Sequence, residues 1–136
     1  MDFLRTLSVA ASGLKAQSGR MRVIAENIAN ADSTGSTPGA DPYRRKVPTF
    51  VGRFDRELDA SVVELGRVRR DATAFRTRLE PGHPAADAAG QVKLPNVNTL
   101  VESVDMREAQ RSYEANLNLI TATRRMVART LDILRA

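Results

Sequence analysis

The chain has 136 residues, enough for one domain with a modest core, and a formal net charge of +5. It contains no cysteine, which excludes a disulfide framework, a thiolate metal site and a thiol nucleophile. Only 4% of the residues are aromatic, so few bulky side chains are available to enclose a substrate pocket. The composition favours a structural protein over an enzyme.

The N-terminal segment does not read as a signal peptide. Lys15, Arg20 and Arg22 interrupt any apolar core that a cleaved secretory signal would need. The sequence holds no apolar stretch long enough to predict a transmembrane helix. If the protein leaves the cytoplasm, we expect a route that needs no cleaved signal peptide.

Apolar and small side chains recur at spacings of three and four through the first thirty residues, which predicts a long amphipathic helix. These positions are Leu4, Leu7, Ala11, Leu14, Ser18, Met21, Ala25 and Ile28. The pattern is a heptad sustained over nearly four repeats, and its small residues would let a partner helix approach closely. The turn-forming residues 30–35 end it.

A second long helix is predicted after Pro95, with Thr99 and Glu102 as a capping box. Its heptad consists of Met106, Tyr113, Ile120, Val127 and Leu134, with Gln110, Leu117, Arg124 and Leu131 at the companion positions. Two of the companions are polar, which indicates contacts with several neighbours or a residue that fixes register. Both helices are too long for the remaining chain to cover, so we expect them to pack on each other and on other copies.

The segment between the helices is rich in turn residues and in short runs typical of strands. Residues 33–42 are predicted to form a loop, and residues 43–54, 61–70, 75–79 and 91–94 are strand candidates. We therefore predict a mainly α fold with a small β subdomain. Residues 1–32 and 98–136 would form a helical coiled-coil core domain, and residues 33–97 a loop and a β-rich outer insertion.

No residue pattern predicts catalysis or a cofactor. The single histidine, His83, has no second histidine or cysteine to share a metal, so we interpret it as a turn residue. Glu102, Asp105 and Glu108 lie near one helix face. We interpret them as a solvated face near the positive end of the helix dipole rather than as a divalent-cation site.

Two asparagines at the end of the first helix allow two interpretations. Asn27 and Asn30 suit helix termination, because asparagine tolerates the left-handed conformation. They also suit hydrogen bonding to a neighbouring helix or subunit, which would fix register. Glu114 and Asn116, near Tyr113, offer a matching polar cluster on the second helix.

Motifs in the right order along nearly the whole chain resemble a known family. Ser12-Gly13-Leu14, Ala16-Gln17, Arg20-Met21 and the run from Ala25 to Asn30 resemble the N-terminal signature of flagellar axial proteins, the rod, hook and hook-associated subunits. Residues 42–46, 80–84, 90–98 and 104–116 are similar to the proximal rod proteins of the flagellar basal body in particular.

This resemblance implies a structural subunit whose terminal helices pack inside a tubular rod, transmit torque and enclose the export channel. It implies partners that are further copies of the chain, other proximal rod proteins, the adaptor subunit that joins the rod to the inner-membrane ring, and the flagellar type III export apparatus. It implies no cofactor, metal, nucleic acid or small-molecule ligand. The rod would span the periplasm, and export would leave the N-terminus uncleaved.

The residues expected at subunit interfaces follow from the heptads and the family motifs. The helix seam would consist of Leu4, Leu7, Ala11, Leu14, Met21, Ile28, Tyr113, Leu117, Ile120, Val127, Leu131 and Leu134. Polar contacts would be made by Glu26, Asn27, Asn30, Asn96, Asn98, Glu114 and Asn116.

Two other functions are considered beside the rod. Residues 43–78 hold ten Lys or Arg against five Asp or Glu, so a basic helical module that binds nucleic acid is the alternative. The N-terminal heptad stripe could also lie on a lipid surface. The charge of the first thirty residues is only +2, and the seam residues are small, which argues against lipid binding.

Overall fold

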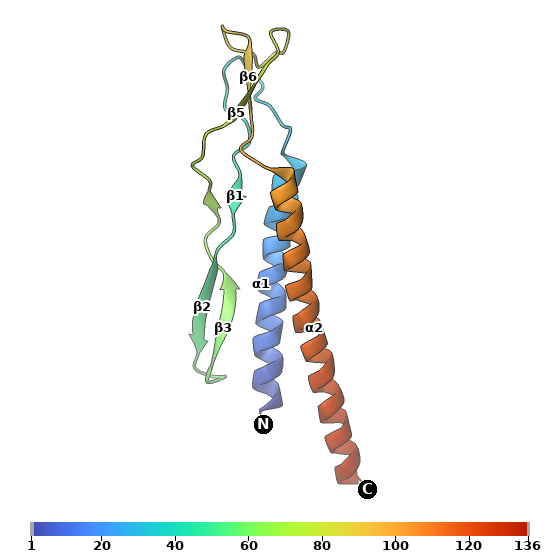
Figure 1. Cartoon of the computed structure of the whole chain (residues 1–136). Helices are drawn as coiled ribbons and strands as arrows, with labels where there is room; N and C mark the ends of the chain where they lie inside the picture. The colour runs from blue at the N-terminus through green and yellow to red at the C-terminus, as the bar shows by residue number, and fades with distance from the viewer. Residues whose placement is uncertain (1, 136) are drawn as a thin grey trace. The chain divides into compact units, whose positions relative to one another are not determined.

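The computed structural model describes residues 2–135, which form two long helices with short strands between them (Figure 1). Helix α1 spans Phe3–Ala29 and helix α2 spans Thr99–Arg135. The strands are β1 (Lys46–Val47), β2 (Phe50–Asp55), β3 (Ala60–Leu65), β4 (Arg69–Arg70), β5 (Arg76–Leu79) and β6 (Gln91–Leu94). The prediction of a mainly helical fold with a small β region is confirmed, while coiled-coil packing stays a prediction.

Among residues 2–135 the structure has three strand pairings, and each is antiparallel. β1 pairs with β4, β2 with β3, and β5 with β6, so each sheet has two strands. In the longest pair the register runs from Phe50 opposite Leu65 to Asp55 opposite Ala60. Isolated two-stranded sheets are only marginally stable in water, so these strands depend on packing against the rest of the chain.

The chain forms two compact units, and each helix contributes to both. The first unit contains residues 2–21, Thr49–Arg67 and residues 107–135. The second contains Arg22–Pro48 and Val68–Met106. This grouping runs across both helices. The division into a helical core domain and an outer insertion, with boundaries near residues 32 and 98, therefore stays a prediction.

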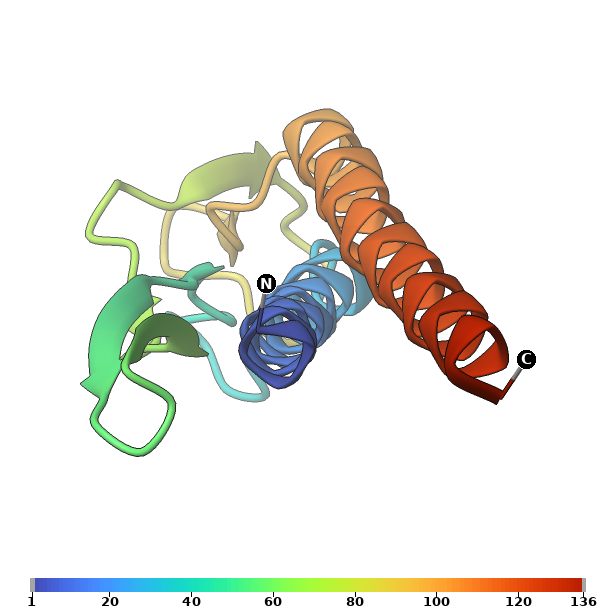
Figure 2. The same cartoon turned by 90° about the horizontal axis from the view of Figure 1, so that it is seen from below.

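In the first unit α1 lies between the β2–β3 hairpin and α2, as both views show (Figures 1 and 2). On the hairpin side, the backbone N–H of Val63 donates to Ser12 Oγ at 3.2 Å. On the helix side, a Cβ placed on Gly13 would lie only 2.7 Å from Oδ1 of Asn116. Gly13 is thus in close contact with the amide end of the Asn116 side chain at this level of the two helices.

The buried positions of α2 in the first unit are small or polar. Ala109 and Thr123 are fully buried, and Asn116, seven residues from each, is half-buried. Each lies one residue before a companion position of the predicted heptad. The buried positions are therefore shifted by one residue from the companion positions Gln110, Leu117 and Arg124 of the predicted heptad.

The second unit has its own small core where the chain leaves α1 and enters α2. Its buried apolar residues include Val23, Ile24, Ala31, Ala85, Val92, Leu94 and Val97. Arg76 on β5 holds these segments together, because its guanidinium donates to the carbonyls of Pro95 and Ala31. This core brings the end of α1 and the start of α2 into one unit.

Candidate functional site

The most highly organised part of the second unit is a polar network of five side chains. Asn27 comes from the last turns of α1, and Glu102 from the first turn of α2. Arg45 directly precedes β1, Asp71 directly follows β4, and Asn96 lies between β6 and α2. We refer to these five residues as the polar network.

Asn27 is completely buried, and its amide makes every hydrogen bond that it can. Its Nδ2 donates to the carbonyl of Lys46 at 2.8 Å and to Glu102 Oε2 at 3.1 Å. Its Oδ1 accepts from the backbone N–H of Lys46 at 2.9 Å and from the Tyr43 hydroxyl at 2.8 Å. One side chain thereby joins α1, α2 and the start of β1.

Tyr43 donates its proton in this arrangement, so the phenol must stay neutral. Burial raises the pKa of Tyr43 from 10.0 to about 12, with further contributions from the negative charges of Glu26 and Glu102. The hydroxyl is therefore a donor to Asn27 throughout the neutral and mildly alkaline range.

Glu102 is a buried carboxylate with only 1% of its surface exposed, and Arg45 compensates its charge. Nε of Arg45 donates to Glu102 Oε1, while its Nη1 lies 3.3 Å from Asp71 Oδ2 and its Nη2 3.9 Å from Asp105 Oδ2. Burial lowers the pKa of Arg45, but hydrogen bonds and charges from Glu102 and Asp71 outweigh it and raise that pKa overall. The guanidinium thus stays charged among three carboxylates.

Asp71 and Asn96 attach the outer strands to this centre. Asp71 Oδ1 accepts from the backbone N–H of Thr73 at 2.9 Å, and this bond is the main cause of a lowered pKa for Asp71, to which Arg45 also contributes. Asn96 Oδ1 accepts from the backbone N–H of Arg45 at 2.8 Å, and its Nδ2 donates to Thr73 Oγ1 at 2.9 Å. The network is therefore connected from α1 to the loop after β4.

The predicted capping box of Thr99 and Glu102 is wrong. Asn98 caps α2 instead, because its Oδ1 accepts from the backbone N–H groups of Leu100 at 3.1 Å and Val101 at 3.3 Å. The carboxylate of Glu102 is turned to Arg45, whose positive charge attracts it more strongly than a backbone N–H group would.

The interpretation of the acidic run as a solvated face is also wrong for its first member. Glu102 is buried in the polar network, whereas Glu108 is exposed and pairs with Arg20 at 3.2 Å. Over residues 2–135, no group of three or more His, Cys, Asp or Glu side chains is placed to hold a metal ion.

The other polar residues singled out in the sequence have local roles within the chain. Asn30 Nδ2 donates to the carbonyl of Glu26 at 2.9 Å, which suits helix termination. Glu26 also pairs with Lys46 Nζ. Asn116 Nδ2 donates to the carbonyl of Ser112 within α2, and Glu114 is exposed. Their contacts with other subunits stay a prediction.

The predicted helix seam is mostly accessible in the single chain. Half-buried members are Leu7, Leu14, Met21, Ile28, Tyr113, Ile120 and Val127, and exposed members are Leu4, Ala11, Leu117, Leu131 and Leu134. The contact of these side chains with neighbouring subunits stays a prediction. Residues that sequence reasoning missed are Tyr43, Arg45 and Asp71, although the first two lie in the motif at residues 42–46.

Comparisons with known proteins agree with this architecture of paired terminal helices. Residues 7–37 match the family described as flagella basal body rod protein, and residues 88–133 match the flagellar basal body rod FlgEFG protein C-terminal family. The flagellar basal-body rod protein FlgC of Agrobacterium fabrum is 53% identical over 100% of this chain and 99% of its own length. The chain belongs to the FlgC family of flagellar basal-body rod proteins.

Two more distant FlgC proteins show how far this relationship extends. FlgC of Aquifex aeolicus is 38% identical over 97% of both chains, and FlgC of Yersinia enterocolitica is 36% identical over 98% of both. FlgC proteins are structural rod proteins and not enzymes. Within residues 2–135, neither helix carries a stretch long and apolar enough to cross a membrane.

Proposed function

We propose that the chain is a structural subunit of the proximal flagellar rod that assembles through its terminal helices. The observation that carries the proposal is the apolar surface of α2. Its exposed large apolar side chains include Leu117, Leu119, Met126, Leu131, Ile133 and Leu134. Such a concentration of apolar surface on one helix marks a protein–protein interface. Packing the same residues between subunits would bury them.

The two helices would form the core of the rod wall. Their heptads, with Leu7, Leu14 and Met21 on α1 and Tyr113 and Ile120 on α2, support packing as a coiled coil within or between subunits. Residues 1–32 and 98–136 would line the inner part of the tube. Residues 33–97 would face outward. Many parallel contacts of this kind would transmit torque around a central export channel.

The partners would be further copies of the chain, the other proximal rod proteins and the adaptor subunit at the inner-membrane ring. The family relationship supports delivery through the flagellar type III export apparatus without signal cleavage, to a rod that spans the periplasm. Neither the family nor the relatives support the nucleic-acid-binding alternative.

The test replaces two exposed apolar residues near the end of α2. Leu131 and Leu134 are 51% and 78% exposed, so Leu131→Asp with Leu134→Asp should leave the isolated chain folded. In cells it should abolish rod assembly, because each carboxylate would be buried between subunits. Asn118→Asp, a nearly isosteric change at an exposed position of α2, is the control and should preserve swimming. Normal rods in the double variant would refute the proposal.

A further inference from the structure

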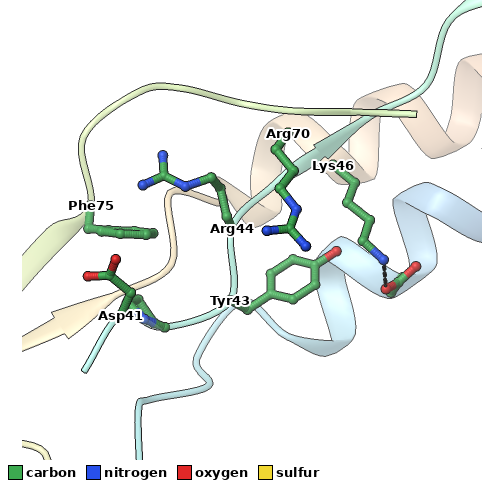
Figure 3. Close-up of a pocket in the computed structure, with 8 residues that line it drawn as sticks. Asp41, Tyr43, Arg44, Lys46, Arg70 and Phe75 are labelled. Carbon is green, nitrogen blue, oxygen red and sulfur yellow. Dashed lines mark hydrogen bonds and ion pairs between the residues drawn. The ribbon is translucent and has the colours of Figure 1, made fainter. Parts of the chain in front are cut away.

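A cleft of about 400 Å³ opens in the second unit, beside the polar network. Its walls combine aromatic rings with side chains of both charges (Figure 3). It is lined by three basic and two acidic residues, two aromatic residues and a proline: Glu26, Asp41, Pro42, Tyr43, Arg44, Lys46, Arg70 and Phe75. An open cleft with this lining suits a segment that carries a carboxylate next to an apolar side chain.

Most of the charged groups in the cleft already have partners in the chain. Arg44 stacks over the Phe75 ring, 4.2 Å from its centroid, and donates to the carbonyl of Asp71 at 2.9 Å. Lys46 pairs with Glu26. These interactions fix the walls, so the cleft is organised before anything binds to it.

Arg70 is the exception. Its side chain is exposed and extends between Arg44 and Lys46 toward the ring of Tyr43 (Figure 3). Among residues 2–135 no hydrogen bond or ion pair of its guanidinium is present. A planar guanidinium without a partner is well suited to receive a carboxylate.

The chain carries a segment of matching chemistry on its first unit, at the turn between β2 and β3. Residues 55–59 contain three acidic side chains and one arginine, for a charge of −2, with Leu58 among them. Asp55 is occupied in the turn, where its Oδ1 accepts from the N–H of Glu57. Glu57 is exposed, and over residues 2–135 its carboxylate makes no ion pair.

The backbone of this turn is also unusual. Asp59 has a φ of +48°, in the left-handed region that residues other than glycine seldom adopt. Aspartate tolerates this region better than most residues, so it suits a tight turn. Asp55 Oδ1 accepts hydrogen bonds from the backbone N–H groups of Glu57 and Leu58, which orders the turn that carries Glu57.

We propose that the β2–β3 turn of one copy binds in the cleft of the next copy, with Glu57 on Arg70 and Leu58 against Tyr43. The inference rests on the proposed assembly of the chain into the rod. The contact joins two different surfaces, so it is heterologous and generates a ring or a helical array rather than a two-fold dimer. It would add a register-setting contact between outer segments to the packing of the helices.

Cross-linking tests this contact directly, because the natural chain has no cysteine. Cells that lack the native gene express Arg70→Cys copies together with Glu57→Cys copies, and isolated basal bodies are treated with a short bismaleimide. A spacer is needed, because an Arg–Glu pair holds the Cα atoms farther apart than a disulfide allows. Arg78→Cys replaces Arg70→Cys in the control, since Arg78 is exposed in the same unit but does not line the cleft.

The expected result is a cross-linked dimer that is roughly tenfold more abundant for the 70–57 pair than for the 78–57 pair. Equal yields, or no dimer, in basal bodies that contain the chain would overturn the inference and leave the rod function standing. Basal bodies without the chain would instead refute the proposed function.

Charge reversal provides a second readout that does not depend on cross-linking geometry. Arg70→Glu and Glu57→Arg should each reduce swimming in soft agar. The variant with both changes should swim normally again, whereas the control variant with Arg78→Glu and Glu57→Arg should keep the swimming defect. Single variants that swim normally, or a double variant no better than the singles, would overturn the inference. A swimming defect in the Arg70→Glu variant with no defect in the Glu57→Arg variant would also overturn the inference, because the residue bound to Arg70 would then not be Glu57.

Discussion

Removal of the Glu102 carboxylate should be among the most destabilising single changes in the second unit. Glu102→Ala leaves the Arg45 guanidinium without its main partner and Asn27 Nδ2 with one acceptor fewer. Loss of one partner of a buried ion pair costs about 3–5 kcal/mol. Arg45 is 21% exposed and keeps Asp71 at 3.3 Å, so we expect the lower end of that range.

A loss of about 3 kcal/mol corresponds to a fall in Tm of roughly 10 °C for a chain of this length. The free energy of unfolding would be measured by urea titration with far-ultraviolet circular dichroism. Glu108→Ala is the matched control, because Glu108 pairs with Arg20 at 3.2 Å but is exposed. An exposed pair of this kind contributes about 0–1 kcal/mol.

A double-mutant cycle with Arg45→Met isolates the pair itself. The two changes should be strongly non-additive, with a coupling free energy of about 1–3 kcal/mol, because the second removes the charge that the first leaves unpaired. Additive effects, or a loss for Glu102→Ala no larger than that for Glu108→Ala, would refute the view that the polar network holds the second unit together.

Three further predictions concern other parts of the structure. Asn98→Ala should lower the free energy of unfolding by about 1 kcal/mol, because the cap of α2 is lost. Asn98→Asp should keep most of the stability of the native chain in the same urea titration, because aspartate also caps helices. Gly13→Ala should stabilise the chain by less than the roughly 1 kcal/mol that helix propensity favours, because the Asn116 side chain must move away from the new Cβ and lose its hydrogen bond to Ser112. The full gain should appear when Asn116→Ala is also present, and a full gain in the single variant would contradict the close contact. The pKa of Tyr43 is raised to about 12, so its neutral phenol contributes stability that is constant below pH 10 and lost between about pH 10 and 12. Over that range the difference in free energy of unfolding between the native chain and Tyr43→Phe should shrink. A constant difference would contradict the role of the neutral phenol as a donor.

The helices and strands were largely predictable because their signals are local. The apolar heptad from Leu4 to Ile28 and the turn residues after it placed the first helix, and α1 ends at Ala29. Alternation at Val47, Thr49 and Val51 indicated extended chain, and β1 and β2 lie there.

The polar network was not predictable because it depends on long-range pairing. Arg45 and Glu102 are 57 positions apart, and periodicity shows which face a residue occupies but not which charge lies opposite. The buried residues of α2 were missed for a related reason. Ala109 and Thr123 are small or polar, so a pattern of large apolar side chains does not mark them.

The most direct test of the rod assignment is electron microscopy of basal bodies from a strain that lacks this chain, combined with a swimming assay. The assignment predicts non-motile cells whose basal bodies have membrane rings but no completed rod or hook, and recovery when the native chain is supplied. Intact, rotating flagella in the absence of the chain would contradict it.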